Sequence, residues 1–565
     1  MTTGEKAALT LQRAFELASR PDTVLTPERV QGYLKTGEWS LDTYWDLAAA
    51  QAASRPDVPV IVDQDGATMT WGALKAQSEA FAAALLDLGY RPGDCLGIQL
   101  PNWSEFCVAV LGAVRAGVLP TLIHPPYRSF EMEYILGLTQ ARGVVVPREY
   151  RGTDHVALAR QVRTALPHLR DIIAVRGAGE LAFRELVETH RGDAVAAPDP
   201  VSTDLFVLMF TSGTTSRPKG VMHVHANLLN ACRKYVEAFE LGPTDRWLVV
   251  TPFTHLTAFG IPLLTGALAA GSSLVLLEAW DAAKALELVE RYQVTHLVGA
   301  PPMLLDIARS PDLDARDLSS LRFLMYAGAP CPVEILRRLQ ARLGCALAAF
   351  YGWTEGLAHT FTTPTDPLEV TSVTVGRTGP GWEWRVVGDG GRTAAPGERG
   401  EFWGRGPNFS PGYYRQPQFI AERFQPDGWF MSGDIMVRNP GDTFTYVART
   451  DDMINRGGQK LDPREVEELL YQHPKVAHVA VVAMPAPRAG QQGCAFVVPH
   501  GGASLTLTEI RDFLAEKGLA RYKWPKRLEL VDALPHTPTG KIMRYALRER
   551  LAGGLSSAAR TAGGA

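Results

Sequence analysis

The centre of the chain reads LFVLMF at residues 205–210, TSGTTSRPKG at 211–220 and VM at 221–222. The first run is short and apolar, which is typical of a buried strand, and a tight loop leaves its end. Glycines in such a loop let backbone N–H groups approach an anion, and hydroxyls and cations complete a polyphosphate site. The loop lacks the Gly-Lys-Ser/Thr ending of a Walker A motif. The expected phosphate contacts are Thr211, Ser212, Gly213, Thr214, Thr215, Arg217 and Lys219.

Strands and helices alternate along the chain on both sides of this loop. Apolar runs at 59–62, 95–100 and 118–123 have the length of strands, whereas residues 74–88 and 106–116 carry apolar side chains at helical spacing. The same alternation returns after the loop. This rhythm predicts an α/β fold with buried, mostly parallel strands.

The last third of the chain has a different pattern. Short strands split by Gly and Pro predict a smaller β subdomain, and a polar stretch at 448–460 then precedes a unit of roughly 100 residues, the size of a small α+β domain. Its first helix has Asp462 as the N-cap, Pro463 at the first helical position and Glu465 to close a capping box. The spacing of Thr and Glu at 506–509 predicts a second capped helix.

Composition and charge narrow the class of protein. A chain of 565 residues is too long for one core and predicts roughly two to four domains. The net charge of −3 gives no basic field for nucleic acid or anionic lipid. The six cysteines form no Cys-x-x-Cys pair, which indicates reduced core residues and a cytoplasmic protein. Neither a signal peptide nor a run of about 18 apolar residues is present, so no membrane span is predicted.

Four further motifs accompany the loop: YGWTE at 351–355, WFMSGD at 429–434, ARTDD at 448–452 and PTGK at 538–541. Together they resemble the motifs of the adenylate-forming superfamily, which contains acyl-CoA synthetases, adenylation domains of peptide synthetases and firefly-type luciferases. The resemblance spans residues 45 to 551, and Ala448 replaces the glycine that is usual in the third motif. It implies that ATP activates a carboxylic acid as acyl-AMP with release of pyrophosphate, in the presence of Mg²⁺, before transfer to coenzyme A.

The resemblance also implies roles for individual residues. Lys541 would bridge the carboxylate and the α-phosphate, Thr354 would contact that phosphate, and Glu355 would hold Mg²⁺. Tyr351 would face adenine, with a turn on the other side of the base. Asp434 would accept the ribose hydroxyls. The remaining nucleotide contacts expected are Gly328, Ala329, Pro330 and Arg449.

The expected domains follow from the same resemblance: an N-terminal adenylation domain at 1–448, a hinge at 449–452, a mobile C-terminal domain at 453–551 and a disordered tail at 552–565. Asp451 would be the residue whose torsions change as the small domain rotates. One position would present Lys541, and the other would bring Gly457 and Gly458 to a channel for coenzyme A.

The acyl pocket is expected around the segment FTHLTAFG at 253–260. It contains no Asp to pair a substrate ammonium and has His255-Leu256 where dihydroxybenzoate-activating relatives have His-Asn. A mainly apolar pocket favours a medium-chain, alicyclic or aromatic acid, and His255 either gates the pocket or packs. The expected pocket residues are Phe253, His255, Leu256, Ala258, Phe259, Gly260, Met303 and Trp353.

Three alternatives remain at this point. A stand-alone adenylating enzyme that loads the phosphopantetheine of a carrier protein would share every motif. A luciferase-like reaction is less supported, and a non-catalytic nucleotide-binding homologue would not need Lys541, Glu355, Asp434 and Lys219 together. A monomer or a homodimer is expected.

Overall fold

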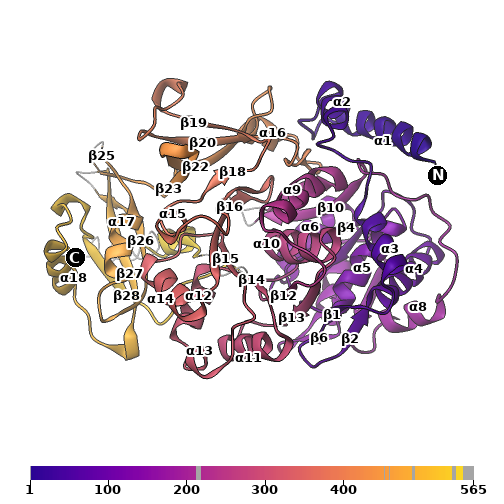
Figure 1. Cartoon of the computed structure of the whole chain (residues 1–565), viewed down its shortest axis with the longest axis horizontal. Coiled ribbons are helices and arrows are strands. Elements are labelled where there is room, and N and C mark those ends of the chain that lie inside the picture. Colours follow the sequence, from indigo (N-terminus) through magenta and orange to yellow (C-terminus); the bar gives the residue numbers. More distant parts are fainter. Residues whose placement is uncertain are drawn as a thin grey trace, which may run out of the picture.

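The computed structural model describes residues 2–211, 218–450, 452–456, 459–486, 490–537 and 542–551. The chain forms a large N-terminal domain with two long sheets and a smaller four-stranded sheet, followed by a small C-terminal α+β domain (Figure 1). The predicted α/β class, with a β subdomain and a small α+β C-terminal domain, is therefore confirmed.

The first long sheet contains the strand that the central apolar run predicts. That strand, β10, lies between β4, to which it is parallel, and β11, to which it is antiparallel. The strand order of this sheet is β21 (Gly412–Tyr413), β11 (Lys219–Val224), β10 (Leu205–Thr211), β4 (Leu119–Leu122), β3 (Cys95–Ile98), β5 (Gly143–Pro147), β8 (Asp171–Val175) and β9 (Leu181–Ala182).

The second long sheet is parallel through its centre and antiparallel at its two ends. Its order is β18 (Arg377–Thr378), β17 (Leu357–Phe361), β16 (Ala346–Trp353), β15 (Phe323–Ala327), β14 (His296–Gly299), β12 (Arg246–Val249), β13 (Ser273–Leu276), β1 (Pro59–Val62) and β2 (Thr68–Thr70).

Helices between the two long sheets share one core with both. Phe106, Phe206 and Phe259 are fully buried there together with strand residues such as Leu274 and Met325. The buried aromatic side chains each remove a large apolar area from water, which makes this core the main stabilising region. The helices are α3 (Tyr44–Ser54), α4 (Trp71–Asp87), α5 (Ser104–Arg115), α9 (His225–Ala238), the short α10 (Leu256–Ala258) and the π-helix η1 (Phe259–Ala269).

The outer faces of the sheets are covered by separate helices with their own apolar clusters. On the first sheet these are α6 (Ser129–Thr139) and α7 (His155–Ala165), and on the second they are α11 (Ala282–Tyr292), α12 (Pro301–Arg309) and α14 (Val333–Leu343). No described helix is long and apolar enough to cross a bilayer.

The β subdomain joins the two long sheets to the C-terminal domain. Its strands are β19 (Glu383–Val387), β20 (Arg399–Arg405), β22 (Phe430–Arg438) and β23 (Phe444–Arg449), and the helix α16 (Gln418–Arg423) precedes β22. Two N-terminal helices, α1 (Thr3–Ala18) and α2 (Pro27–Thr36), lie beside it at the top of Figure 1.

The C-terminal domain packs α17 (Pro463–Leu470) and α18 (Leu507–Glu516) on a sheet of β24 (Ile454–Arg456), β25 (Gln459–Leu461), β26 (Val476–Ala486), β27 (Gly490–Pro499) and β28 (Arg527–Leu530). The predicted capping box of α18 is present, with Thr506 and Glu509 bonded to each other's backbone N–H groups.

The predicted capping box of α17 is wrong. Asp462 is the N-cap and Pro463 follows it, but the Asp462 carboxylate accepts from the Arg464 N–H. The carboxylate of Glu465 instead pairs with Lys523, a residue distant in sequence, and lies 3.5 Å from Arg399. Cation partners supplied by the tertiary structure therefore replace the local backbone donor.

Candidate active site

Glu355 lies in the turn after β16 and is held from both its backbone and its side chain. Its carbonyl accepts from the Ser410 N–H at 2.6 Å, and its Oε1 accepts from the Tyr413 hydroxyl at 2.7 Å. The residue is only 8% exposed. Burial raises the pKa of Tyr413 well above its ordinary value, so Tyr413 remains a hydrogen-bond donor.

The donor set around Glu355 suits Mg²⁺ rather than a cation held by protein alone. The described residues contain no cluster of three or more His, Cys, Asp or Glu side chains with metal-binding spacing. Mg²⁺ is usually bound by one or two carboxylates together with water and substrate phosphates. Because the described residues bond only Oε1 of Glu355, Oε2 could supply such a single carboxylate contact.

Lys219 is the first residue of β11 and lies opposite Thr211 at the base of the phosphate loop. Its Nζ lies 4.1 Å from the centre of the Phe419 ring and 3.5 Å from Oε2 of Glu422. Burial, and then the charge of Arg423, lower the pKa of Lys219. The residues between these strands that were expected to bind phosphate, namely Ser212, Gly213, Thr214, Thr215 and Arg217, lie outside the described residues.

The segment 410–416 connects Glu355 to the phosphate loop. Besides the two bonds to Glu355, Gln416 accepts from the Gly220 N–H at 2.8 Å, and the Tyr414 N–H donates to the Gly220 carbonyl at 2.8 Å. Tyr413 and Gln416 are not among the site residues predicted from the sequence. Only the pairing of β21 with β11, residues nearly two hundred positions apart, reveals their place.

Asp434 lies on β22 with its carboxylate largely engaged. Its Oδ2 accepts from the Tyr351 hydroxyl at 2.6 Å and from the Trp353 indole N–H at 3.1 Å. Its Oδ1 lies 3.5 Å from a guanidinium nitrogen of Arg449 on β23. Tyr351, Asp434 and Arg449, which were predicted to bind one nucleotide, are thus brought together. Thr354 lies in the turn beside them, between β16 and Glu355.

Trp353 does not lie in the expected acyl pocket. Tyr351 and Trp353 are two positions apart on β16, so their side chains point to the same face of the strand. The Trp353 ring packs among Phe402, Phe409 and Phe430 under the β subdomain. The period of the strand therefore directs the Trp353 side chain towards Asp434 and the β subdomain.

The predicted turn of Gly328, Ala329 and Pro330 follows β15 and is exposed. Since β15 and β16 are parallel, with Ala327 opposite Phe350, this turn leaves the sheet at the same edge as Tyr351. Such an edge, at the carboxyl ends of parallel strands, is the usual ligand side of an α/β sheet.

Most of the segment expected to line the acyl pocket is interior. Phe253 and Phe259 are fully buried and stack on Phe106 and Phe206, with ring centroids 5.1 and 5.8 Å apart. Leu256 and Ala258 are buried with them, Gly260 lies against the Leu357 side chain, and Met303 belongs to the cluster on the outer face of the second sheet. His255 is partly exposed.

His255 has a second histidine behind it. The rings of His124 and His255 lie 6.4 Å apart, and Nδ1 of His124 is 2.7 Å from the Thr254 hydroxyl. Burial, with a smaller contribution from His255, lowers the pKa of His124 to about 3, so this ring is neutral at physiological pH. Asn102 fixes the same loop through bonds to the Phe253 N–H and the Thr251 carbonyl.

Polar contacts join the C-terminal domain to the end of the N-terminal domain. Arg464 of α17 donates to the carbonyls of Tyr446 and Val447 on β23, at 2.7 and 3.1 Å. Asp452, the last residue of the predicted hinge 449–452, pairs with Arg548 at 2.7 Å. The predicted hinge Asp451, channel residues Gly457 and Gly458, and catalytic Lys541 lie outside the described residues.

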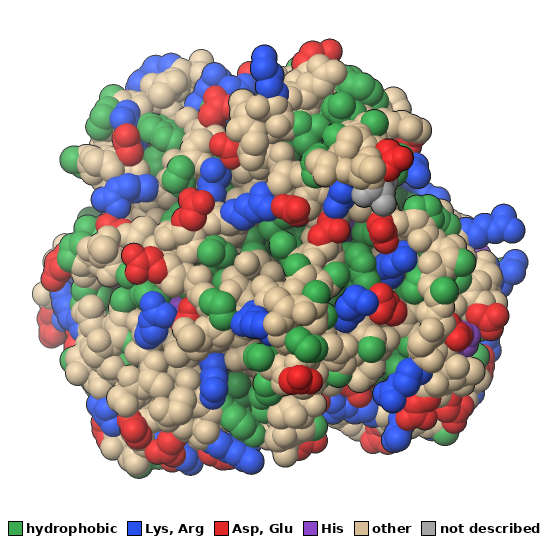
Figure 2. Space-filling model, turned by 45° about the vertical axis from the view of Figure 1, so that its right-hand side comes forward, with side chains coloured by type: hydrophobic (Ala, Val, Ile, Leu, Met, Phe, Trp, Pro, Cys, Tyr) green, Lys and Arg blue, Asp and Glu red, His purple; other side chains and the backbone are tan. Residues whose placement is uncertain are grey.

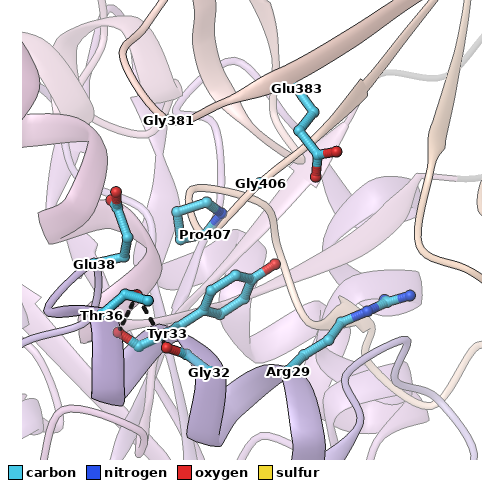
Figure 3. Close-up of a pocket in the computed structure, with 9 residues that line it drawn as sticks. All are labelled: Arg29, Gly32, Tyr33, Thr36, Glu38, Gly381, Glu383, Gly406 and Pro407. Carbon is cyan, nitrogen blue, oxygen red and sulfur yellow. Dashed lines mark hydrogen bonds between the residues drawn. The ribbon is translucent and has the colours of Figure 1, made fainter.

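A separate hollow of about 370 Å³ lies between α2 and the β subdomain (Figure 3). Tyr33 points into it, with Glu38 and Glu383 on opposite sides, and none of the predicted site residues lines it. On the face of the molecule in Figure 2, basic and acidic side chains are interspersed, as the net charge of −3 suggests.

Comparisons with known proteins agree with this geometry. Residues 48–414 match the AMP-binding enzyme family, and residues 465–541 match the AMP-binding enzyme C-terminal domain. The chain is 33% identical to a medium-chain fatty-acid–CoA ligase of Escherichia coli (strain K12), over 92% of the chain and 93% of the relative. It is 34% identical to a 2,3-dihydroxybenzoate-AMP ligase of Bacillus subtilis (strain 168), over 93% and 96%.

Among solved structures, the fold is similar to that of the anthranilate CoA ligase AuaEII in complex with anthranoyl-AMP, with a TM-score of 0.84 and 26% identity. The match covers 91% of this chain and 98% of that structure. Fold and site together define an AMP-forming acid–thiol ligase of the acyl-CoA synthetase type, which uses ATP, Mg²⁺ and coenzyme A. The chain belongs to the AMP-binding enzyme family.

Proposed function

We propose that this chain activates an aromatic, alicyclic or medium-chain carboxylic acid without a charged tail as its acyl adenylate and transfers the acyl group to coenzyme A. The observation that carries this proposal is the convergence of Glu355, Lys219 and Asp434 from three sheets. The segment 410–416 joins Glu355 to the base of the phosphate loop, and Tyr351, on the strand before Glu355, bonds to Asp434. A nucleoside triphosphate requires carboxylates for its ribose and Mg²⁺ and cations for its phosphates, so this arrangement supports the proposal.

The nucleotide would lie among these residues. Asp434, with Arg449 beside Oδ1, would hold the ribose, and Tyr351 with the turn at Gly328, Ala329 and Pro330 would enclose adenine. The interior bond of the Tyr351 hydroxyl to Asp434 fixes both side chains before ATP binds. Thr354 and Lys219 would contact the phosphates, together with the loop residues Thr211, Ser212, Gly213, Thr214 and Thr215.

In the first half-reaction the carboxylate oxygen of the acid attacks the α-phosphorus of ATP. The new O–P bond forms as the bond to the bridging oxygen of the β-phosphate breaks, and pyrophosphate leaves. Two anions meet in this step, so cations that neutralise the developing charge lower its barrier. Glu355 would hold Mg²⁺, which supplies part of this neutralisation, and Lys541 would bridge the carboxylate and the α-phosphate.

In the second half-reaction the thiolate of coenzyme A attacks the acyl carbonyl carbon, and AMP leaves with the electron pair of the C–O bond. No cysteine of the chain is needed, and all six are buried free thiols. Rotation about Asp451 would bring Gly457 and Gly458 towards this reaction. The contacts of Arg464 with β23 and of Asp452 with Arg548 would define one of the two positions.

The acid would enter beside His255 and Leu256 at the partly exposed edge of the buried segment. Neutral His124 and the aromatic side chains of Phe253 and Phe259 behind it offer no charge for a charged substrate tail. Relatives and structural neighbours are named for medium-chain fatty acids, 2,3-dihydroxybenzoate and anthranilate. These acids support the proposed substrate class as a whole.

Loading of a carrier protein is the second candidate, because one relative is named as an AMP ligase rather than a CoA ligase. We place the protein in the cytoplasm on the basis of its six reduced, buried cysteines. A monomer or homodimer stays our expectation for the oligomeric state.

The test is pyrophosphate release with ATP, Mg²⁺ and a panel of acids that includes octanoate, cyclohexanecarboxylate, benzoate and anthranilate. Each acid is measured with and without coenzyme A. Sustained turnover that requires coenzyme A supports the proposal. A single burst that coenzyme A does not change favours a carrier protein as acceptor, and the absence of release with every acid refutes the substrate class.

A further inference from the structure

Arg423 ends the helix α16, whose side chains surround Lys219. Phe419 and Glu422, from the same helix, lie 4.1 and 3.5 Å from the Lys219 ammonium, as measured to the ring centre and to Oε2. None of these three side chains belongs to the sites predicted from the sequence. The helix therefore brings a further cation to the base of the phosphate loop.

The guanidinium of Arg423 also lies against the strand that carries Asp434. Gly433 has a φ of +73°, and a Cβ added there would stand 3.3 Å from Nη1 of Arg423 and 3.0 Å from Nη2 of Arg449. Two guanidinium groups thus approach the same point, next to Asp434. Because α16 also contacts Lys219, Arg423 lies between the expected ribose end and the phosphate loop.

The three cations differ in their partners. Lys219 has Glu422, and Arg449 has Asp434. Arg423 makes neither a hydrogen bond nor an ion pair through its side chain with any residue that the structure describes, although it is partly buried. Its charge disfavours protonation of Lys219, which indicates that the two cations interact.

Arg423 therefore adds a positive charge beside Lys219 that no described side chain neutralises directly. Like charges repel each other, and a polyanion bound between them relieves this repulsion. A guanidinium suits this task because its planar N–H groups can bond two phosphate oxygens at once. Arg449 already lies beside Asp434 at the expected ribose end, whereas the helix that ends in Arg423 contacts Lys219.

We propose that Arg423 is a further substrate-binding residue whose guanidinium binds the β- and γ-phosphates of ATP beside Lys219. The inference rests on the proposed function, because it takes the loop at 211–220 as the triphosphate site. It adds a contact from the β subdomain to a phosphate site otherwise built from the first sheet. The pyrophosphate that leaves would retain this contact.

The experiment measures the binding of AMP, ADP and ATP, each with Mg²⁺, to the full-length protein by isothermal titration calorimetry. Arg423→Ala should lower the affinity for ATP about 10- to 100-fold, the range expected for charge-assisted hydrogen bonds. The affinity for ADP should fall less, and the affinity for AMP should fall by less than about twofold. Arg423→Lys should recover part of the loss, since it restores the charge without the paired N–H groups.

Arg337→Ala is the matched control, because Arg337 is an exposed arginine on α14 whose ion pair is with Glu334 on the same helix. It should leave all three affinities unchanged. Equal weakening of AMP and ATP by Arg423→Ala, or an unchanged affinity for ATP, would overturn the inference. Unchanged AMP binding also reports that the variant is folded. Wild-type protein that binds no ATP would refute the proposed function as well.

Discussion

The Tyr413 hydroxyl donates a 2.7 Å hydrogen bond to Oε1 of Glu355, 58 positions earlier in the chain. Tyr413 is itself fixed by the N-terminal segment, since its N–H donates to the Asp22 carbonyl at 3.2 Å. Asp22 also accepts from the Arg415 N–H at 2.7 Å through its carboxylate. A segment that precedes residue 48, where the family match begins, therefore supports the side chain proposed to hold Mg²⁺.

Tyr413→Phe should raise the Mg²⁺ concentration needed for half-maximal activity about tenfold, because a group that orients a metal-binding carboxylate typically contributes 10- to 100-fold to metal affinity. Glu355→Gln should raise it further. Mg²⁺ titration of pyrophosphate release measures both effects. Identical Mg²⁺ curves for Tyr413→Phe and wild type would show that the bond has no part in metal binding.

Gly412→Ala should destabilise the contact between the N-terminal segment at Asp22 and β21. Gly412 has a φ of +153°, and a Cβ there would stand 2.2 Å from the Asp22 carbonyl oxygen. We expect a loss on the order of 2 kcal/mol in the free energy of unfolding, and lower activity. Gly32→Ala on α2 is the control, since a Cβ there meets open space. Equal unfolding temperatures for the two variants would contradict the steric argument.

Asp462→Asn should change how stability depends on pH. Burial raises the pKa of Asp462 to about 6, so the folded protein keeps this proton at a pH where the unfolded chain has lost it. Stability from this group is therefore present below about pH 4 and is lost as the pH rises to about 6. Asparagine caps a helix equally well and does not titrate, so the variant should gain on the order of 2 kcal/mol at pH 7 relative to wild type. Thermal unfolding between pH 4.5 and 7.5 measures the difference, and parallel curves would exclude this carboxyl as the cause.

Lys541→Ala should lower the rate of acyl-AMP formation about 100-fold or more, because it removes a cation from the meeting point of two anions. Conversion of preformed acyl-AMP to the thioester should remain within a few-fold of wild type. Rapid-quench measurement of each half-reaction separates the two. Equal loss in both half-reactions would exclude the proposed division of labour between two positions of the C-terminal domain.

Features encoded by neighbouring residues could be predicted from the sequence. The strand at 205–210, the loop after it and the capped helix at 506–509 each follow from local periodicity or local hydrogen bonding, and the structure confirms the two elements that it describes in full. The α/β class followed from the same local signals repeated along the chain. The meeting of Tyr351, Asp434 and Arg449 could also be predicted, because their motifs resemble those of a known family.

Features made by distant residues could not be predicted. Tyr413 and Gln416 reach Glu355 and Gly220 only because β21 pairs with β11, and nothing in their own neighbourhood indicates that pairing. Glu465 has the spacing of a capping box, but the fold provides Lys523 as a stronger partner. Trp353 was assigned to the acyl pocket from its motif, and the alternation of side chains along β16 directs it to Asp434 instead.

We conclude that this protein joins an acid to coenzyme A through an acyl adenylate. The most direct test incubates the purified protein with ATP, Mg²⁺, coenzyme A and the best acid of the panel, and identifies the products by mass spectrometry. We expect acyl-CoA and AMP in equal amounts, with acyl-AMP accumulating when coenzyme A is omitted. Release of ADP, or acyl-AMP that coenzyme A never consumes, would contradict it.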